Sequence, residues 1–126
     1  MKDNVLRNTL QITKALADSH RIRILMLLQE GELCVCQIME VFDLAMSTIS
    51  KHLSILAAAD LVVSRKDGRW AYYRLSTTSE NKQIKTILSW LQQSLQDDDQ
   101  ITNDQRKLKT EVACTPQDLR KRQTKR

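Results

Sequence analysis

The feature that most constrains the fold of this chain is a pair of short amphipathic segments, residues 33–42 and 46–59, with a brief break between them. In the second segment, Ile49, Leu53 and Leu56 recur at the i, i+4, i+7 spacing that places apolar side chains on one face of a helix. Two short helices joined by a tight break are typical of a helix-turn-helix motif. We therefore expect this motif, with the polar face of its second helix exposed.

Most of the remaining chain also favours helices. Apolar residues recur at three- and four-residue steps in residues 5–17, 20–29 and 79–96, which predicts three further helices. Asp18 is a typical cap at a helix start, and Gly31 is placed to end the second helix. Only 2 Gly and 1 Pro occur among 126 residues, which argues against an all-β fold with many tight turns.

A β-hairpin is predicted after the second helix of the motif. Residues 61–63 begin a β-prone run, Asp67-Gly68 is a two-residue turn signal, and residues 70–75 return as an aromatic-rich strand. The predicted fold is therefore mainly α with a small β-hairpin. Three basic side chains cluster near the turn: Arg65, Lys66 and Arg69. A local basic surface of this kind is what nucleic acid binding requires.

The length allows one small domain and no more. We assign residues 1–96 to this domain and expect residues 97–126 to form a polar, basic and flexible tail, because that segment has many charges and few apolar anchors. A frayed helix followed by disorder is expected there. The apolar stripes of residues 5–17 and 79–96 exceed what one small core can bury. This surplus favours a homodimer.

The sequence also bears on the compartment. No stretch approaches the roughly 20 apolar residues that cross a bilayer, and the N-terminus lacks the apolar region of a secretory signal. We therefore expect a cytoplasmic protein without a membrane span. An odd count of 3 cysteines in a reducing compartment argues against a disulfide framework. Metal binding, redox sensing and simple packing remain as roles for the cysteines.

Three motifs in this order resemble the ArsR/SmtB family of winged helix-turn-helix repressors. Residues 32–36 (Glu-Leu-Cys-Val-Cys) look like the metalloid- and metal-binding motif that opens the third helix of arsenite- and cadmium-responsive members. Residues 47–53 look like the family's recognition helix, and residues 65–76 look like its wing. The resemblance covers residues 10–95 and implies a dimeric repressor of double-stranded operator DNA.

The expected contacts with DNA come from the recognition helix and the wing. Short polar side chains and a lysine on the helix would reach base edges or phosphates, with Ser50 placed at the DNA backbone. A merely solvated helix face is the alternative. The predicted DNA-binding residues are Ser47, Thr48, Ser50, Lys51, Arg65, Lys66 and Arg69.

The predicted inducer site is built from cysteines. Cys34 and Cys36 offer thiolates for As(III), with Sb(III), Cd(II) or Pb(II) as further candidates. Residues i and i+2 of an ideal helix point roughly 200° apart, so one ion could bind both only by distorting the first turn of the third helix. That distortion would disturb the neighbouring recognition helix. Cys114 is either a third ligand, from the same or the other subunit, or an inert exposed thiol.

Two residues depart from the family pattern. Met39 stands where the best-known arsenite sensors have a third cysteine, and Ala45 stands where a serine often caps the recognition helix. Loss of that cap would cost about 1 kcal/mol. His20 and His52 are expected to serve at a helix start and in hydrogen-bonded packing rather than as metal ligands.

The sequence thus predicts a homodimeric repressor that leaves its operator when As(III) binds, without a permanently bound cofactor. One alternative keeps the fold and senses Cd(II) or Pb(II). Another makes the thiols a redox- or sulfide-responsive pair, with Cys36 and Cys114 linked on oxidation. A third alternative is a thiol carrier or oxidoreductase without a DNA partner. No set of catalytic residues can be assembled from the motifs, so we expect no enzyme.

Overall fold

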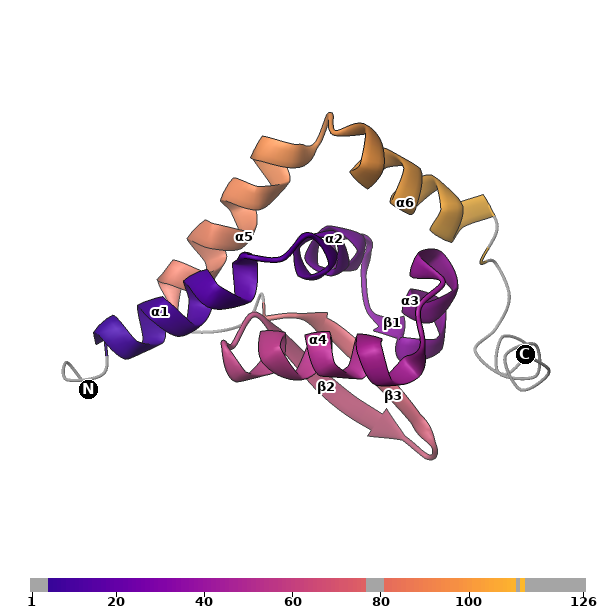
Figure 1. Cartoon of the computed structure of the whole chain (residues 1–126), viewed down its shortest axis with the longest axis horizontal. Coiled ribbons are helices and arrows are strands. Elements are labelled where there is room, and N and C mark those ends of the chain that lie inside the picture. Colours follow the sequence, from indigo (N-terminus) through magenta and orange to yellow (C-terminus); the bar gives the residue numbers. More distant parts are fainter. Residues whose placement is uncertain (1–4, 77–80, 111, 113–126) are drawn as a thin grey trace.

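The computed structural model describes residues 5–76, 81–110 and 112. In chain order, its elements are α1 (Val5–Leu16), α2 (Ser19–Leu27), the short 3-10 helix η2 (Leu28–Glu30), β1 (Leu33–Cys34), α3 (Val35–Phe42), α4 (Met46–Ala58), β2 (Val62–Asp67), β3 (Trp70–Leu75), α5 (Lys82–Leu95) and α6 (Asp99–Thr110). Figure 1 shows α2 near the centre, with α4 and the strands on one side and α5 and α6 on the other. The mainly helical fold class with one small sheet is confirmed.

Local signals set several helix ends. The Asp18 carboxylate accepts hydrogen bonds from the backbone N–H groups of His20 (2.8 Å) and Arg21 (3.2 Å), and so caps α2. Gly31 ends η2 with a φ of 129°, which glycine adopts without steric cost. The start of α5 was predicted near residue 79, but its cap is Asn81, whose side chain accepts from the backbone N–H of Gln83 at 2.9 Å.

The helix-turn-helix is formed by α3 and α4, as predicted. Asp43 ends α3 in the left-handed region, with a φ of 52°, and this turns the chain toward α4. The apolar stripe of α4, formed by Ile49, Leu53 and Leu56, is fully buried against the core. Burial of this stripe leaves the opposite face of α4 on the surface.

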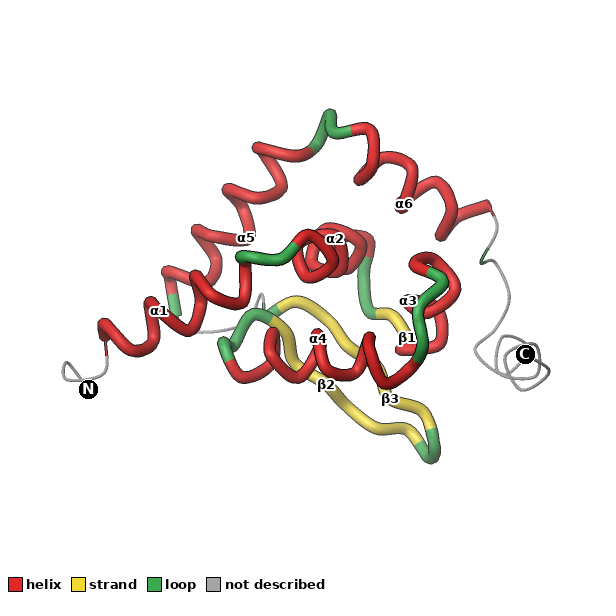
Figure 2. Tube along the Cα trace, viewed as in Figure 1, coloured by secondary structure: helices red, strands yellow, loops and turns green. Residues whose placement is uncertain are grey.

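The wing is part of a three-stranded antiparallel sheet with the order β1-β3-β2. Figure 2 shows the strands next to α4, with the β2–β3 turn extending away from the helices. Asp67 pairs with Trp70 across a turn in which Gly68 has a φ of 65°. The sequence did not predict β1. This strand is two residues long and pairs Leu33 and Cys34 with distant residues of β3, so it has no local signal.

Where the sequence predicts a frayed helix at the start of the tail, residues 99–110 form α6, a regular helix that packs on the domain. Ile101 and Leu108 are buried against the domain, where α6 packs on α2 and α3. Asp104 is buried too, and its two oxygens accept from Nε (2.8 Å) and Nη2 (2.9 Å) of Arg23 on α2. The folded unit therefore extends through α6 to the buried Val112.

Candidate DNA-binding face and cysteine pair

The exposed face of α4 carries the residues predicted to meet DNA. Ser47, Thr48 and Lys51 are exposed, whereas Ser50 is half-buried. The three exposed side chains border a groove of about 570 Å³ that α4 shares with the start of α2: Asp18, Arg21, Ser47, Thr48, Lys51, His52 and Ile55. Short polar side chains with a lysine beside a hollow give a surface that a nucleic acid backbone and base edges can approach closely.

The wing brings its three predicted basic residues to the surface, but they differ in their surroundings. Lys66 and Arg69 lie beside the turn and are exposed. The guanidinium of Arg65 instead donates to both carboxylate oxygens of Glu32, at 2.6–3.0 Å, and lies 4.5 Å above the centre of the Tyr72 ring. The hydrogen bond from Arg65 lowers the pKa of Glu32. Arg65 is thus bound to the segment immediately before β1.

Cys34 and Cys36 lie at the junction between the wing sheet and α3. Cys34 pairs with Tyr72 in the sheet and is also the residue that caps α3. Its Sγ accepts from the backbone N–H of Cys36 at 3.4 Å, and its own backbone N–H donates to Oε1 of Gln37 at 2.8 Å. Both thiols are buried, with exposed fractions of 0% for Cys34 and 2% for Cys36.

This geometry corrects the predicted arrangement of the thiols. Because Cys34 has an extended backbone, with φ −71° and ψ 146°, the two cysteines do not both lie within a regular helix. The roughly 200° separation of helical residues i and i+2 therefore does not apply. A hydrogen bond with the Cys34 side chain, together with burial, strongly raises the pKa of Cys36. The two thiols are in contact without any distortion of α3.

Two other sulfur-bearing residues, Met39 and Cys114, bear on the predicted ion site. Met39 is half-buried and packs against the core. Cys114 lies outside the described residues, so its predicted place beside the thiol pair remains a prediction.

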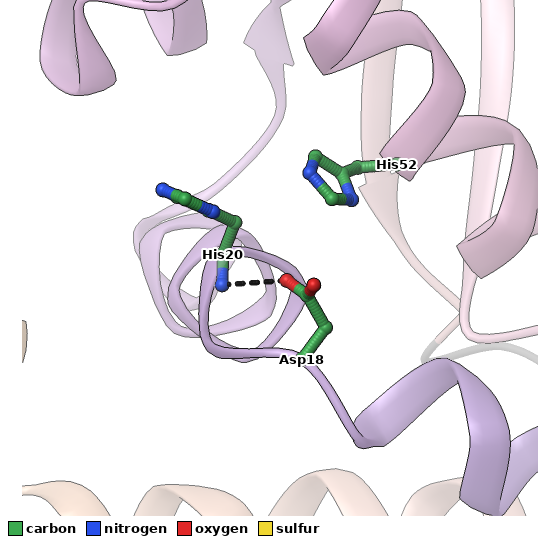
Figure 3. Close-up of side chains that lie close together, drawn as sticks. All are labelled: Asp18, His20 and His52. Carbon is green, nitrogen blue, oxygen red and sulfur yellow. Dashed lines mark hydrogen bonds between the residues drawn. The ribbon is translucent and has the colours of Figure 1, made fainter.

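A cluster that the sequence did not predict lies between α2 and α4. Figure 3 shows Asp18 just before α2, His20 in its first turn, and His52 projecting from α4. Their ligand atoms lie within 4.8 Å of one another. The sequence carries no signal for this group, because His52 is far along the chain from the other two. His52 is half-buried, and its Nδ1 accepts from Nη1 of Arg21 at 3.2 Å, which agrees with the predicted hydrogen-bonded packing.

Electrostatics within this cluster follow from burial and from Arg21. Burial lowers the pKa of His52, and the nearby charge of Asp18 opposes this shift. Burial alone would raise the pKa of Asp18, but the backbone hydrogen bond from Arg21 and the charge of its guanidinium outweigh it and lower the pKa. Asp18 is therefore a carboxylate at neutral pH.

Within residues 5–76 and 81–110, no helix combines the length and the apolar character that crossing a bilayer requires.

The sequence is similar to those of known regulatory proteins. The sequence pattern of the family described as "Bacterial regulatory protein, arsR family" matches residues 18–64. An arsenical resistance operon repressor from Escherichia coli is 46% identical over 68 residues, which cover 53% of this chain and 58% of that repressor. A repressor of the same name from Bacillus subtilis is 41% identical over 81 residues, which cover 64% of this chain and 77% of that repressor.

Solved structures share the fold. HlyU from Vibrio cholerae superposes with a TM-score of 0.62 and 29% identity, covering 75% of this chain and 97% of that one. A homodimeric winged helix-turn-helix DNA-binding domain from Mycobacterium bovis gives a TM-score of 0.64 and 28% identity, covering 76% of this chain and 85% of that one. The predicted family is thereby confirmed. The chain belongs to the arsR family of bacterial regulatory proteins, which are DNA-binding transcriptional regulators and not enzymes.

Proposed function

We propose that this chain is a homodimeric repressor that binds operator DNA and is released from it by a thiophilic ion, with As(III) as the inducer. The observation that carries the proposal is the contact between the buried thiols of Cys34 and Cys36 at the junction of the wing sheet with α3. The names of the E. coli and B. subtilis relatives support arsenical resistance genes as the genes it controls.

The DNA-binding part of the proposal rests on charge and exposure. Ser47, Thr48 and Lys51 would enter the major groove from α4, while Lys66 and Arg69 would contact phosphates from the wing. Phosphate contacts of this kind make affinity fall steeply with salt. A homodimer would present two copies of α4 to the two halves of a roughly palindromic site.

The proposed release of DNA depends on two roles of Cys34 in the ion-free protein. Its Sγ accepts the N–H of Cys36 at the start of α3, and its backbone pairs with Tyr72 of the wing sheet. An ion that binds both sulfurs imposes its own separation and angle on them. Coordination would draw the Cys34 sulfur away from the N–H of Cys36 and so weaken the cap of α3. Because α3 packs on α4 and β1 pairs with β3 of the wing, we infer that this change reaches both parts that would contact DNA.

The chemistry of the thiol pair favours As(III). Soft ions prefer thiolate ligands, and arsenous acid exchanges each hydroxyl for a thiol with loss of one water. Exchange of this kind does not require the thiols to ionise first, which suits a pair in which the pKa of Cys36 is strongly raised. As(III) can hold three sulfurs, and we propose Cys114 as the third, from the same or the other subunit. Sb(III), Cd(II) and Pb(II) are the competing inducers.

The test is fluorescence anisotropy of labelled DNA from upstream of the coding sequence, with reduced, metal-free protein. We expect arsenite to release the DNA from the wild type. The double variant Cys34→Ser/Cys36→Ser should bind DNA and keep it bound when arsenite is added. Cys114→Ser should need more arsenite for release if Cys114 is the third ligand.

Each other outcome removes one part of the proposal. Equal release from the double variant would exclude the thiol pair as the sensor. Release by cadmium alone would exclude As(III) as the inducer, and release by an oxidant alone, reversed by reductant, would favour a redox sensor. Absence of DNA binding would exclude the repressor function.

A further inference from the structure

We propose that Asp18, His20 and His52 form a second cation site, separate from the thiol pair, for a borderline divalent ion such as Zn²⁺. Each residue offers one ligand atom, and the three atoms lie within 4.8 Å of one another. Two imidazoles and one carboxylate are a ligand set that suits Zn²⁺ or Ni²⁺ and that does not suit a soft ion. The two sites would therefore respond to different ions.

The carboxylate of Asp18 can serve two purposes at once. Its Oδ1 accepts both backbone hydrogen bonds that cap α2. Its Oδ2 has an ion-pair contact of 3.9 Å with Nη1 of Arg21. Coordination by Oδ2 would therefore leave the cap of α2 in place.

A cationic group already lies between two of the proposed ligands. Nη1 of Arg21 is 3.2 Å from Nδ1 of His52 and 3.9 Å from Oδ2 of Asp18. Arginine donates and cannot accept, so the lone pair of His52 Nδ1 points toward this positive group. A metal ion that used the same two lone pairs would take the place of Nη1, and Arg21 would be its competitor.

The site would close by rotation of the three side chains toward one another. Zn²⁺ lies about 2.0–2.2 Å from nitrogen and oxygen ligands, so tetrahedral ligands are roughly 3.3 Å apart. The present separations of up to 4.8 Å must shrink accordingly. All three residues are half-buried, and Asp18 and His52 line the groove beside α4, which leaves an entry path for the ion.

A bound ion would join the start of α2 to α4, the helix whose exposed face carries Ser47, Thr48 and Lys51. It would hold α4 in its present orientation and add positive charge beside this face. We therefore expect such an ion to strengthen DNA binding, in contrast to the releasing effect proposed for As(III). This consequence rests on the proposed function, whereas ion binding itself does not.

The test uses the fact that the chain has only 2 histidines, both in this cluster. Proton NMR of the imidazole C2–H groups reports each of them without overlap from other histidines. We would titrate Zn²⁺ into the full chain carrying Cys34→Ser, Cys36→Ser and Cys114→Ser, purified without a histidine tag. Both resonances should shift together and saturate at one ion per chain, and Mg²⁺ should move neither.

Variants of the ligands and of the competing arginine make the test specific. Asp18→Asn keeps a good helix cap but should weaken Zn²⁺ binding at least about tenfold, as should His20→Gln. Arg21→Gln should tighten it, because the competing cation is gone. Asp60→Asn, a matched loss of an exposed carboxylate elsewhere, should leave the affinity unchanged.

Three results would overturn the site: a shift of only one imidazole, unchanged affinity in Asp18→Asn, or weaker binding in Arg21→Gln. Each would mean that the cluster serves only to hold α2 against α4. If Zn²⁺ binds but DNA affinity does not rise, the failure lies in the consequence for DNA and not in the ion site.

Discussion

Arg23 shows how much of this fold can depend on one side chain. Its guanidinium donates to both oxygens of the buried Asp104 on α6 and lies 4.6 Å from the centre of the Phe42 ring at the end of α3. The bond to Asp104 raises the pKa of Arg23. One residue of α2 thus contacts the helix-turn-helix on one side and α6 on the other.

Replacement of the buried carboxylate should therefore be costly. Asp104→Asn leaves the guanidinium of Arg23 without its charged partner, and we expect a loss of about 2 kcal/mol in the free energy of unfolding. Asp99→Asn, in the exposed first turn of the same helix, should cost less than about 1 kcal/mol. Urea denaturation of both variants measures these losses in the free energy of unfolding. Equal losses would mean that the Arg23–Asp104 pair does not hold α6 in place.

Glu32 should restrain DNA binding by the wing, because it holds the guanidinium of Arg65. Glu32→Gln should raise the affinity for DNA and steepen its dependence on salt by roughly one counterion. Asp67→Asn removes the same charge from the wing without freeing Arg65 from its hydrogen bonds, so its effect should be smaller. Fluorescence anisotropy over a series of salt concentrations compares the DNA affinities of the two variants. An equal gain from both variants would show a general charge effect only.

At the scale of elements, local signals explain what the sequence could predict. The caps at Asp18 and Gly31, the stripe on α4 and the Asp67-Gly68 turn each act within a few residues, and the elements they define were found. What the sequence did not predict, the strand β1 and the packing of α6 on the domain, depends on distant partners. β1 exists through its pairing with β3, and α6 is placed by its packing on α2 and α3.

The candidate site divides in the same way. Exposure of Ser47, Thr48 and Lys51 follows from helical periodicity and was predictable. The contact between the two thiols depends on Cys34 adopting an extended conformation, which periodicity does not encode. The cluster of Asp18 with His20 and His52 could not be predicted either, because only the packing of α2 on α4 brings it together.

The start of α4 offers a test at this scale. Ala45 has the extended backbone of a capping residue, with φ −64° and ψ 152°, but gives no side-chain hydrogen bond. Ala45→Ser should therefore raise the free energy of unfolding by about 1 kcal/mol. Ala58→Ser, at the other end of the same helix, should lower it by about 0.5 kcal/mol. Thermal unfolding followed by circular dichroism measures the stability of both variants. No gain from Ala45→Ser would mean that solvent already satisfies the first backbone N–H groups of α4.

At the scale of the whole molecule, apolar side chains remain uncovered at the end formed by α1 and α5. Leu6 is 71% exposed on α1, where Val5 and Leu10 are exposed too, and Trp90 is 60% exposed on α5. A groove of about 340 Å³ lies between α1 and α5. Exposed apolar surface of this kind marks an interface, and the Mycobacterium bovis structural relative is homodimeric. We propose that this end forms the dimer interface.

Charge placed on this surface should separate the subunits. The double variant Leu6→Lys/Leu10→Lys should shift the protein to a monomer and lower its DNA affinity, while its fold is retained. Met46→Lys changes an exposed apolar residue at the start of α4 and should leave the dimer intact. Sedimentation equilibrium gives the masses. A dimer that persists in the double variant would place the interface elsewhere.

In the proposed repressor, ion binding at Cys34 and Cys36 and DNA binding disfavour one another. Thermodynamic linkage requires the effect to be reciprocal. The most direct test measures the affinity of the reduced protein for arsenite twice, once without DNA and once with the protein saturated with its upstream DNA. The affinity for DNA is then measured with and without arsenite. We expect DNA to weaken arsenite binding by the same factor by which arsenite weakens DNA binding. Equal arsenite affinity with and without DNA would contradict this expectation.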